Sequence, residues 1–389
     1  MNHGKYAFTQ LFEILSKYQF KKCVDRYKGD RRIKSFTCWN QFMSMAFGQM
    51  TGRDSLRDTV MCLGAHQEKL YHLGIRGPVA RSTLAEANES RDWRIYADFA
   101  QVLIQRARRL YADDKLPIDF EGPVYVIDST VIDLCLSVFW WARFRKTKAA
   151  VKLHVELELH GNIPTFVHVT DARTHDVRFL DKIGFEQDAF YVMDRAYGDF
   201  KRLMMINTRH AYFVIRPRTN FRFEVTGSKR VAKKTGILAD EQGGPLWFRT
   251  KKAYPETLRR ITFFDKDQDR IFDFLTNNFQ LPAIEIAMLY KHRWQIELFF
   301  KWIKQHLKIK KFWGESANAV KTQIWIAICV YLTVAITKKE LGIDRTMYEI
   351  LQILSISAFD KTQLNQLLSN LPVDELNEDS CKQLKLFNF

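Results

Sequence analysis

The segment Val124-Tyr-Val-Ile-Asp-Ser-Thr130 decides the fold, because the periodicity of the chain changes there. Up to about residue 112 the apolar residues recur at helical spacing. This segment is instead a run of β-branched and aromatic residues of the kind that forms a buried strand. The turn signal Gly161-Asn162 predicts a hairpin between two later runs of the same kind. Those later predicted strands span residues 151–159, 163–169 and 190–193.

Helices are expected on either side of the fourth predicted strand, around Val177–Ile183 and from about Phe200. The resulting order is strand, hairpin partner, third strand, helix, strand and helix. This order is that of a mixed sheet of the ribonuclease-H type. We therefore expect an α/β (α+β) fold, in which a ribonuclease-H-like mixed-sheet domain carries a β-rich insertion and follows a helical N-terminal domain.

Three regions are expected along the chain. Residues 1–112 form the helical N-terminal domain, and residues 113–340 form the sheet domain. Residues 341–389 form a short helical C-terminal region that ends in an acidic tail. The helical pattern ends at about residue 112, and the period changes from Pro123.

The β-rich insertion is expected at about 209–275, with a tight turn at Gly243-Gly-Pro245. Its expected strands are 212–215, 222–225, 246–248, 260–264 and 270–275. A long helix is expected to follow from about Pro282 to Leu307. A core helix is expected after it, at 318–340.

The composition indicates a folded protein with a polyanionic partner. Lys and Arg number 60 against 44 Asp and Glu, which gives a net charge of +16, while 47% of the residues are hydrophobic. Residues 200–281 alone contain 17 Lys and Arg against 8 Asp and Glu. Nucleic acid is the first candidate for the partner of such a chain.

Neither a membrane span nor a cysteine-based site is expected. No uninterrupted apolar run approaches the roughly 18 residues that a spanning helix needs, and the most apolar stretch, Ile324–Ile336, is expected to be a core helix. The six cysteines are scattered without a C-x-x-C pair, which disfavours structural zinc and disulfides and fits a reducing cytoplasm. The N-terminus lacks the apolar core of a signal peptide.

The expected long helix contains the spacing Y-x2-R-x3-E-x6-K. Its four members are Tyr290, Arg293, Glu297 and Lys304. On a single helix their side chains point within an arc of roughly 60°. A separate apolar stripe, expected to face the core, consists of Leu289, Ile296, Phe300, Ile303 and Leu307. A carboxylate flanked by two cations and a phenol suits metal binding beside a phosphate backbone, and the alternative is a solvated helix face with an Arg–Glu pair.

Two aspartates directly follow apolar strand cores. Asp128 follows Val124–Ile127, and Asp194 follows Phe190–Met193. If these strands are neighbours, both carboxylates reach the same edge of the sheet, and Glu297 on the packed helix supplies a third. Two-metal phosphoryl transfer needs converging carboxylates of this kind. Each aspartate alone is also compatible with a strand-end turn or a helix cap.

Other acidic residues are expected to be structural. Asp133 lies at an odd offset from Asp128 and therefore faces the other side of the strand. His175 beside Asp176 is a weaker candidate for a second set of metal ligands. Capping roles are favoured for Asp171, Asp176 and Asp199.

Three segments of the chain resemble bacterial Asp-Asp-Glu (DDE) transposases of the insertion sequence 4 family. They are Val126–Thr130, Tyr191–Tyr197 and the Tyr-Arg-Glu-Lys helix at 290–304, which is that family's most specific signature. The resemblance covers about 120–335 closely. The helical region before Ala80 resembles the N-terminal domain of one branch of these transposases. One departure is Ala196, where relatives often have Gly.

The resemblance implies a metal-binding catalytic triad formed by Asp128, Asp194 and Glu297. It implies that the triad uses two Mg²⁺ ions, for which Mn²⁺ can substitute. It also implies that three residues position the phosphates of the DNA end: Tyr290, Arg293 and Lys304. In relatives, the β insertion helps to clamp DNA and supplies an aromatic residue that stacks on a flipped base while a hairpin forms.

Further DNA contacts are expected from basic and aromatic residues. Trp247 is the single Trp of the insertion and has basic neighbours, which favours base stacking, although a buried sheet Trp is the alternative. Lys152 and His154 alternate on one face of a strand and are candidates to approach the scissile DNA strand, with core packing as the alternative. Arg31 and Arg32 lie in a basic cluster that is either a phosphate contact or a solvated turn.

The expected function is that of a cytoplasmic, nucleoid-associated bacterial transposase without membrane contact. Its partner is double-stranded DNA, both the terminal inverted repeats and the target. A homodimer in a synaptic complex is implied by the resemblance, because two ends must be cut in concert. The alternatives are a stand-alone nuclease or junction resolvase with a ribonuclease-H-like core, or a non-catalytic DNA-binding regulator derived from a transposase.

Overall fold

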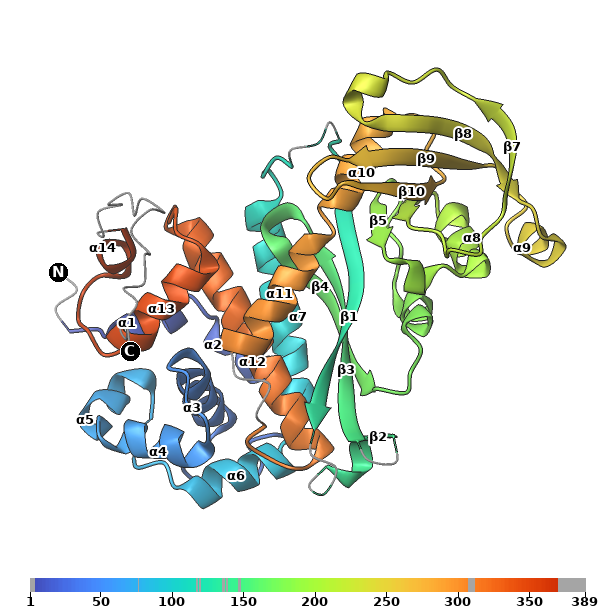
Figure 1. Ribbon diagram of the computed structural model, residues 1–389. Coiled ribbons are helices and arrows are strands. Elements are labelled where there is room, and N and C mark those ends of the chain that lie inside the picture. The colour runs from blue at the N-terminus through green and yellow to red at the C-terminus, as the bar shows by residue number, and fades with distance from the viewer. Residues whose placement is uncertain are drawn as a thin grey trace, which may run out of the picture.

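The computed structural model describes residues 4–369 except 76, 117, 119, 135, 136, 138, 146, 147 and 307–311. The described strands form one ten-stranded mixed sheet with helices on both faces (Figure 1). Leu307 of the expected apolar stripe and the expected acidic tail beyond residue 369 lie outside the described residues.

The centre of the sheet has the strand order β4-β3-β1-β5-β6, which is that of ribonuclease H. β3 is antiparallel to both β1 and β4, whereas β5 is parallel to both β1 and β6. A short strand, β2 (Arg143–Arg145), pairs with the start of β3. The five central strands are β1 (Val124–Leu134), β3 (Lys148–Glu158), β4 (Ile163–Asp171), β5 (Phe190–Met193) and β6 (Tyr212–Ile215). The predicted fold class is therefore confirmed.

The connections between these strands follow the expected order. The hairpin between β3 and β4 turns through η3 (His160–Asn162), where Gly161 and Asn162 have φ of 73° and 53°. Gly and Asn tolerate this left-handed region better than other residues, which is why their sequence signalled the turn. The helix expected before β5 is the 3-10 helix η4 (Asp176–Lys182), and the helix after it is α8 (Phe200–Thr208).

Four strands extend the sheet beyond β6 into a basic arm, which projects to the upper right in Figure 1. They are β10 (Arg270–Thr276), β9 (Leu258–Asp265), β8 (Ile237–Pro245) and β7 (Phe223–Ser228). The insertion was expected to begin at about residue 209, and this boundary is too early in the chain. Its first strand, β6, pairs in parallel with β5 and is the fifth strand of the central sheet, so the arm begins after Ile215.

Two expectations within the arm are wrong. Gly243-Gly-Pro245 does not turn but lies inside β8, and the expected strand at 246–248 is instead the approach to the helix α9 (Phe248–Ala253). The glycine is needed for close approach, because a Cβ on Gly243 would lie 1.9 Å from the carbonyl oxygen of Glu224 in β7. A glycine that admits a neighbouring strand has the same sequence signature as a turn glycine.

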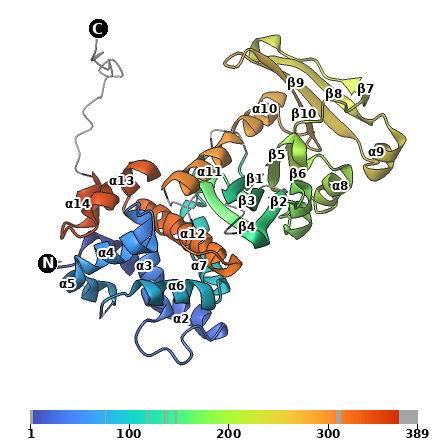
Figure 2. The same cartoon turned by 60° about the horizontal axis from the view of Figure 1, so that its bottom comes forward.

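The N-terminal region is helical, as expected. Its α-helices are α1 (Ala7–Glu13), α2 (Lys17–Arg26), α3 (Cys38–Met50), α4 (Leu56–Gly64), α5 (Gln67–Leu70), α6 (Arg81–Ser90) and α7 (Arg94–Tyr111). In both views α7 lies along α12 (Ala317–Glu340) (Figures 1 and 2), and α7 also packs against β4.

The helix α12 is long and apolar enough to cross a membrane, with a mean hydropathy of 1.7 over its most apolar window. However, 94% of that window is buried inside the protein. The helix is thus a core element, as Ile324–Ile336 predicted, and it packs against surrounding helices, above all α7 and α3.

The C-terminal helices pack back on the start of the chain. They are α13 (Met347–Ser357) and α14 (Leu364–Ser369). The amides of Ala7 and Phe8 donate to the carbonyls of Asp360 and Ala358, and the side chain of Gln10 donates to the carbonyl of Thr362. The first and last described helices therefore form one body (Figure 2).

The expected long helix is broken into α10 (Ala283–Lys291) and α11 (Trp294–His306). Hydrogen bonds of the i→i−3 type join the two, from Arg293 to Tyr290 and from Ile296 to Arg293. Such bonds overwind a helix and change the direction of its side chains. No Gly or Pro marks the break, which is why the residue pattern predicted a continuous helix. The described members of the apolar stripe are all buried: Leu289, Ile296, Phe300 and Ile303.

Candidate active site

Two carboxylates meet where the pairing of β1 with β5 ends. The strands are parallel neighbours, with Ile127 opposite Met193, so the next residues, Asp128 and Asp194, lie side by side at the same edge. The apolar residues before them are fully buried. Burial fixes the register, and the polarity change after it places both aspartates at the surface of the sheet edge.

Helix α11 brings the third carboxylate over this edge. Arg293 Nη1 donates to Asp128 Oδ2 at 3.3 Å, and its Nη2 donates to Glu297 Oε1 at 2.5 Å. From α10 the hydroxyl of Tyr290 donates to Asp194 Oδ1 at 3.3 Å. The structure thus gathers five predicted site residues into one cluster, with Arg293 between two carboxylates and Tyr290 on the remaining one.

Burial and like charge shape the electrostatics of the cluster. Burial, opposed by the Ser129 amide and Arg293 and supported by Asp194 and Glu297, raises the pKa of Asp128 to about 6. Burial and then Asp194 raise the pKa of Tyr290 to about 12, so its hydroxyl stays a donor. The edge therefore carries more negative charge than Arg293 alone neutralises, which favours a further cation.

The donor set fits a divalent metal. Carboxylate oxygens are the ligands that Mg²⁺ and Mn²⁺ prefer. Among the residues that the structure describes, no three His, Cys, Asp or Glu side chains are already grouped to share an ion. The Arg293 guanidinium pairs with the oxygens of both Asp128 and Glu297. A metal here would take the place of that guanidinium as their partner.

Lys304 lies further along α11. Its Nζ donates to the backbone carbonyl of Val131 at 2.8 Å. This bond ties the catalytic-side end of β1 to the helix that carries Glu297. The side chain is partly exposed, so the ammonium remains within reach of solvent.

The expectation that Lys152 and His154 approach DNA is corrected by the structure. Both side chains are buried on the face of the sheet that points away from α11. They therefore take part in core packing, the alternative to a DNA contact. Lys152 Nζ donates to the carbonyl of Thr174 at 2.9 Å, and the His154 ring stacks on Phe179 with centroids 5.2 Å apart. Alternation along β3 was read correctly, but which of its faces the helices cover depends on the tertiary fold.

Trp247 is exposed, which removes the alternative of a buried sheet residue. It precedes α9 and is 62% exposed. A cavity of about 400 Å³ lies beside it, with Arg216, Arg218 and Arg249 in the lining. An exposed flat ring among guanidinium groups is suited to stack on a base.

Arg31 and Arg32 are exposed in the loop between α2 and α3. Arg32 has φ of 62°, within a tight turn that follows α2. The structure places them on the helical part of the protein and does not bring them to the carboxylate cluster. Their exposure leaves both the phosphate contact and the solvated turn open.

A second cavity, which the sequence did not indicate, adjoins the cluster. It has a volume of about 340 Å³ and is lined by Phe272, Tyr290, Trp294 and Arg216, among others. The Arg216 guanidinium lies 4.8 Å from the centre of the Phe272 ring. Since Arg216 also lines the cavity beside Trp247, one guanidinium links the carboxylate edge to the exposed tryptophan.

Comparisons with known proteins agree with this geometry. Residues 119–333 match the family described as transposase DDE domain, and residues 3–76 match a domain of unknown function (DUF4372). A putative transposase, y4zB, of Sinorhizobium fredii is 32% identical over 66% of this chain and 71% of its own length. A probable transposase for insertion sequence element IS5377 of Geobacillus stearothermophilus is 27% identical over 64% of this chain and 65% of its own length.

A solved structure is also similar, at a lower level. A piggyBac transposase synaptic complex with hairpin DNA aligns with 95% of this chain and 82% of that chain, at a TM-score of 0.45 and 9% identity. That similarity is too low to bear on function. The family match covers more than half of the chain and includes both strand-end aspartates and the α11 glutamate. The chain therefore belongs to the DDE transposases of insertion sequence elements, the family of the insertion sequence 4 type that its three motifs resemble.

Proposed function

We propose that this protein is a cut-and-paste transposase. It binds the terminal inverted repeats of its element, cleaves the DNA strands there with a divalent metal, and joins the freed 3′ hydroxyl to target DNA. The observation that carries the proposal is the placement of Asp128 and Asp194 on adjacent parallel strands, with Glu297 tied to Asp128 through Arg293.

Asp128, Asp194 and Glu297 would hold the metal, which is Mg²⁺ or, in its place, Mn²⁺. Two such ions supply activation of the attacking oxygen and stabilisation of the leaving oxygen. Arg293 is the group that must exchange partners. With a metal bound by the carboxylates, its guanidinium would be free to hold a phosphate oxygen, for which its fork geometry is suited.

Tyr290 and Lys304 assist on either side of this exchange. The Tyr290 hydroxyl stays protonated and donates to Asp194, and this bond orients the second carboxylate. Lys304 adds a positive charge about two helical turns beyond Glu297. We assign both to the positioning of the DNA end.

The basic arm supports binding to the DNA backbone. Residues 200–281, which comprise α8, β6 and the arm, contain 17 Lys and Arg against 8 Asp and Glu. Several phosphate contacts of this kind make affinity fall steeply with salt. Double-stranded DNA is therefore the proposed partner, both as terminal repeat and as target.

A hairpin intermediate is the finer part of the proposal. Trp247 presents an exposed ring beside a cavity with three arginines, which suits stacking on a flipped base. Because two element ends must be cut together, we also propose a homodimer within a synaptic complex.

The test is an assay with a labelled terminal repeat of the element and Mg²⁺. The proposal expects nicked, hairpin and joined products to appear in that order. A nuclease or resolvase would release products without joining, and a DNA-binding regulator would shift the DNA without cleaving it. Addition of a chelator provides the control, since it should leave end binding and stop cleavage.

A further inference from the structure

The face of the sheet behind the carboxylate cluster carries a second set of polar residues. Side chains alternate along β1, so Asp128 points to α11 and Ser129 points to the opposite face. There Ser129 meets Asp176, the first residue of η4, together with Lys152 and His154 of β3. None of these four residues acts in the mechanism proposed above.

Asp176 is the centre of this set. Its Oδ1 accepts the Ser129 hydroxyl at 2.6 Å and lies 3.0 Å from the Lys152 ammonium. Lys152 is 9% exposed and also donates to the carbonyl of Thr174, which fixes the loop that leads into η4. A buried ammonium needs a carboxylate, and here the pair is completed by a hydroxyl and a carbonyl.

His154 does not compete with Lys152 as the cation. Burial lowers the pKa of His154 to about 4, so the ring is neutral. The ring nitrogen Nε2 lies 3.0 Å from the Thr170 hydroxyl. The other ring nitrogen, Nδ1, lies 3.8 Å from Asp176 Oδ1, which is too long for a hydrogen bond. The charge balance of Asp176 thus rests on Lys152.

Ser129 connects this set to the first carboxylate. Its hydroxyl donates to Asp176, while its own amide donates to Asp128 Oδ1 at 2.8 Å. The backbone amide of Ser129 therefore holds the Asp128 side chain, while the Ser129 hydroxyl is anchored to Asp176 on the other face of the sheet. A shift of Ser129 moves the donor that orients Asp128.

Tyr197 reaches the same place from the neighbouring strand. It follows Asp194 by three residues, in η5 (Arg195–Tyr197), and its ring is buried. Burial, and after it Asp128 and Asp176, raise the pKa of the hydroxyl well above its usual value. The polar set thus lies on the sheet face behind Asp128 and close to the residues that follow Asp194.

We propose that Asp176 is a positioning residue for metal binding at Asp128, acting through Ser129, with Lys152 as its counter-ion. This inference rests on the proposed function, since it assumes that Asp128 holds the metal. Asp176 itself is not a ligand, because its carboxylate lies on the far face of the sheet and is engaged by Ser129 and Lys152. Partners that orient metal ligands typically change metal affinity or activity by about 10–100-fold when removed.

The test compares full-length variants for Mn²⁺ binding, followed by calorimetry and by electron paramagnetic resonance, and for end cleavage over a range of Mg²⁺ concentrations. Asp176→Asn and, separately, Ser129→Ala should weaken Mn²⁺ binding by about 10–100-fold. The Mg²⁺ concentration for half-maximal cleavage should rise by a similar factor, with end binding unchanged. Asp181→Asn is the matched control, because Asp181 lies on the same η4 helix but pairs with Arg202 at the surface.

A double variant separates positioning from mere stability. Asp176→Asn leaves Lys152 buried without a countercharge, so its melting temperature should fall. Adding Lys152→Met removes that charge and should restore the melting temperature without restoring Mn²⁺ affinity. Recovery of Mn²⁺ affinity in the double variant would overturn the inference, as would wild-type affinity in both single variants. Ser129→Ala removes only a hydroxyl and leaves no buried charge, so it decides the matter if Asp176→Asn fails to fold.

The inference and the proposed function fail in distinguishable ways. If the unchanged protein binds Mn²⁺ but does not cleave element ends, the proposed function fails, and the Mn²⁺ titrations still decide the role of Asp176. If the unchanged protein cleaves and Asp176→Asn matches it at limiting metal, the inference alone fails.

Discussion

Arg293 donates to Asp128 at 3.3 Å and to Glu297 at 2.5 Å, so one guanidinium joins two of the three carboxylates that we assign to metal binding. These carboxylates come from a strand and a helix that are far apart in the chain. Without a cation between them they would repel each other. Arg293 is therefore a built-in counter-ion, and a divalent metal held by the assigned carboxylates would compete with it for the same oxygens.

Replacement of Arg293 by Gln should strengthen metal binding in the absence of DNA. Loss of an interaction of about 1.4 kcal/mol corresponds to a tenfold change, so we expect Mn²⁺ to bind roughly tenfold more tightly. End cleavage should fall, because the phosphate partner is lost. Calorimetric titration with Mn²⁺ measures the change in metal affinity. The Mn²⁺ affinity of Arg293→Lys, which keeps the charge, should lie between those of wild type and Arg293→Gln. Equal or weaker Mn²⁺ binding by Arg293→Gln would contradict the competition.

Replacement of Trp247 by Ala should impair hairpin formation more than the first nick. Stacking of a base on an aromatic ring is worth about 1–3 kcal/mol, and this contact matters only once the base has left the helix. The neighbouring Phe248 is 79% exposed and does not line the cavity, so Phe248→Ala is the control. The products are resolved on a denaturing gel. Equal losses of nicking and hairpin formation would count against stacking.

The buried pair Arg259–Asp240 should be essential for the stability of the basic arm. Its two hydrogen bonds are both 2.8 Å long, and Arg259 also donates to the carbonyl of Leu281 at 2.7 Å. Removing one partner of such a pair typically costs about 3–5 kcal/mol. We expect Asp240→Ala to lower the free energy of unfolding by that amount and Arg259→Met with Asp240→Leu to recover most of it. Urea unfolding measures the stability of both variants. A loss below about 1 kcal/mol for Asp240→Ala would show that the Arg259–Asp240 pair is not essential for the stability of the arm.

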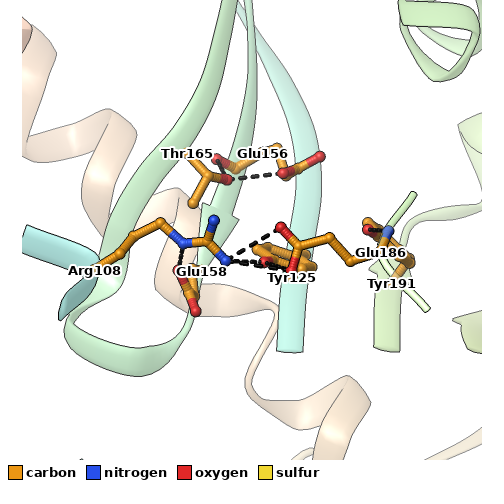
Figure 3. A network of polar contacts seen from close by, with 7 residues as sticks. All are labelled: Arg108, Tyr125, Glu156, Glu158, Thr165, Glu186 and Tyr191. Atoms are coloured by element: carbon orange, nitrogen blue, oxygen red, sulfur yellow. Dashed lines mark hydrogen bonds and ion pairs between the residues drawn. The ribbon is translucent and has the colours of Figure 1, made fainter. Parts of the chain in front are cut away.

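A polar network lies on the same sheet face as Asp176, at the other end of β1 (Figure 3). Arg108 of α7 donates to Glu158 at 2.6 Å, to the Tyr125 hydroxyl at 2.5 Å and to Glu186 at 3.2 Å. The Tyr125 hydroxyl in turn donates to Glu186 at 2.8 Å. One guanidinium thus serves two carboxylates, and a third carboxylate nearby, that of Glu156, is not bonded to it (Figure 3).

Glu156 should make the protein less stable as the pH rises from about 4.5 to about 7. Burial, opposed by the Thr165 hydroxyl, raises its pKa from 4.5 to about 7. In this window the folded state holds a proton that the unfolded state has released, so stability falls with rising pH. Glu156→Gln should remove this loss and gain up to roughly 3 kcal/mol at pH 8, because each pKa unit corresponds to about 1.4 kcal/mol.

The measurement is urea unfolding of the wild-type protein and Glu156→Gln at pH 5 and pH 8. The difference between them should be small at pH 5 and favour the variant at pH 8. Glu224→Gln is a suitable control, since Glu224 is exposed and paired with Lys251 on the arm. A difference that does not change with pH would mean that Glu156 is ionised in the folded protein throughout.

The sequence predicted the parts of the fold that depend on local pattern. The runs 124–127 and 190–193 lie in β1 and β5, and the latter matches its strand in full, because buried strands need uninterrupted apolar residues. The Gly161-Asn162 turn was predictable because only a few residues adopt its backbone conformation. By contrast, Gly243 admits a neighbouring strand, a requirement that is set by a residue distant in sequence.

The candidate site was predictable only where it depends on local sequence pattern. An aspartate after an apolar strand indicated Asp128 and Asp194 without the structure. The break before α11 and the double contact of Arg293 depend on how the helix meets the sheet, and no residue at the break signals them. The sequence favours a capping role for Asp176, but its bond to Ser129 depends on the packing of η4 against β1 and β3.

The most direct test of the central claim is metal-dependent cleavage by Asp128→Asn, Asp194→Asn and Glu297→Gln, each compared with wild type. The variants keep the size of each side chain and remove its charge. We expect each to bind the terminal repeat as tightly as wild type and to lose cleavage by more than about 100-fold, since even outer partners of metal ligands cost 10–100-fold. Cleavage at the wild-type rate by any one of the three would contradict the assignment of that carboxylate to the metal.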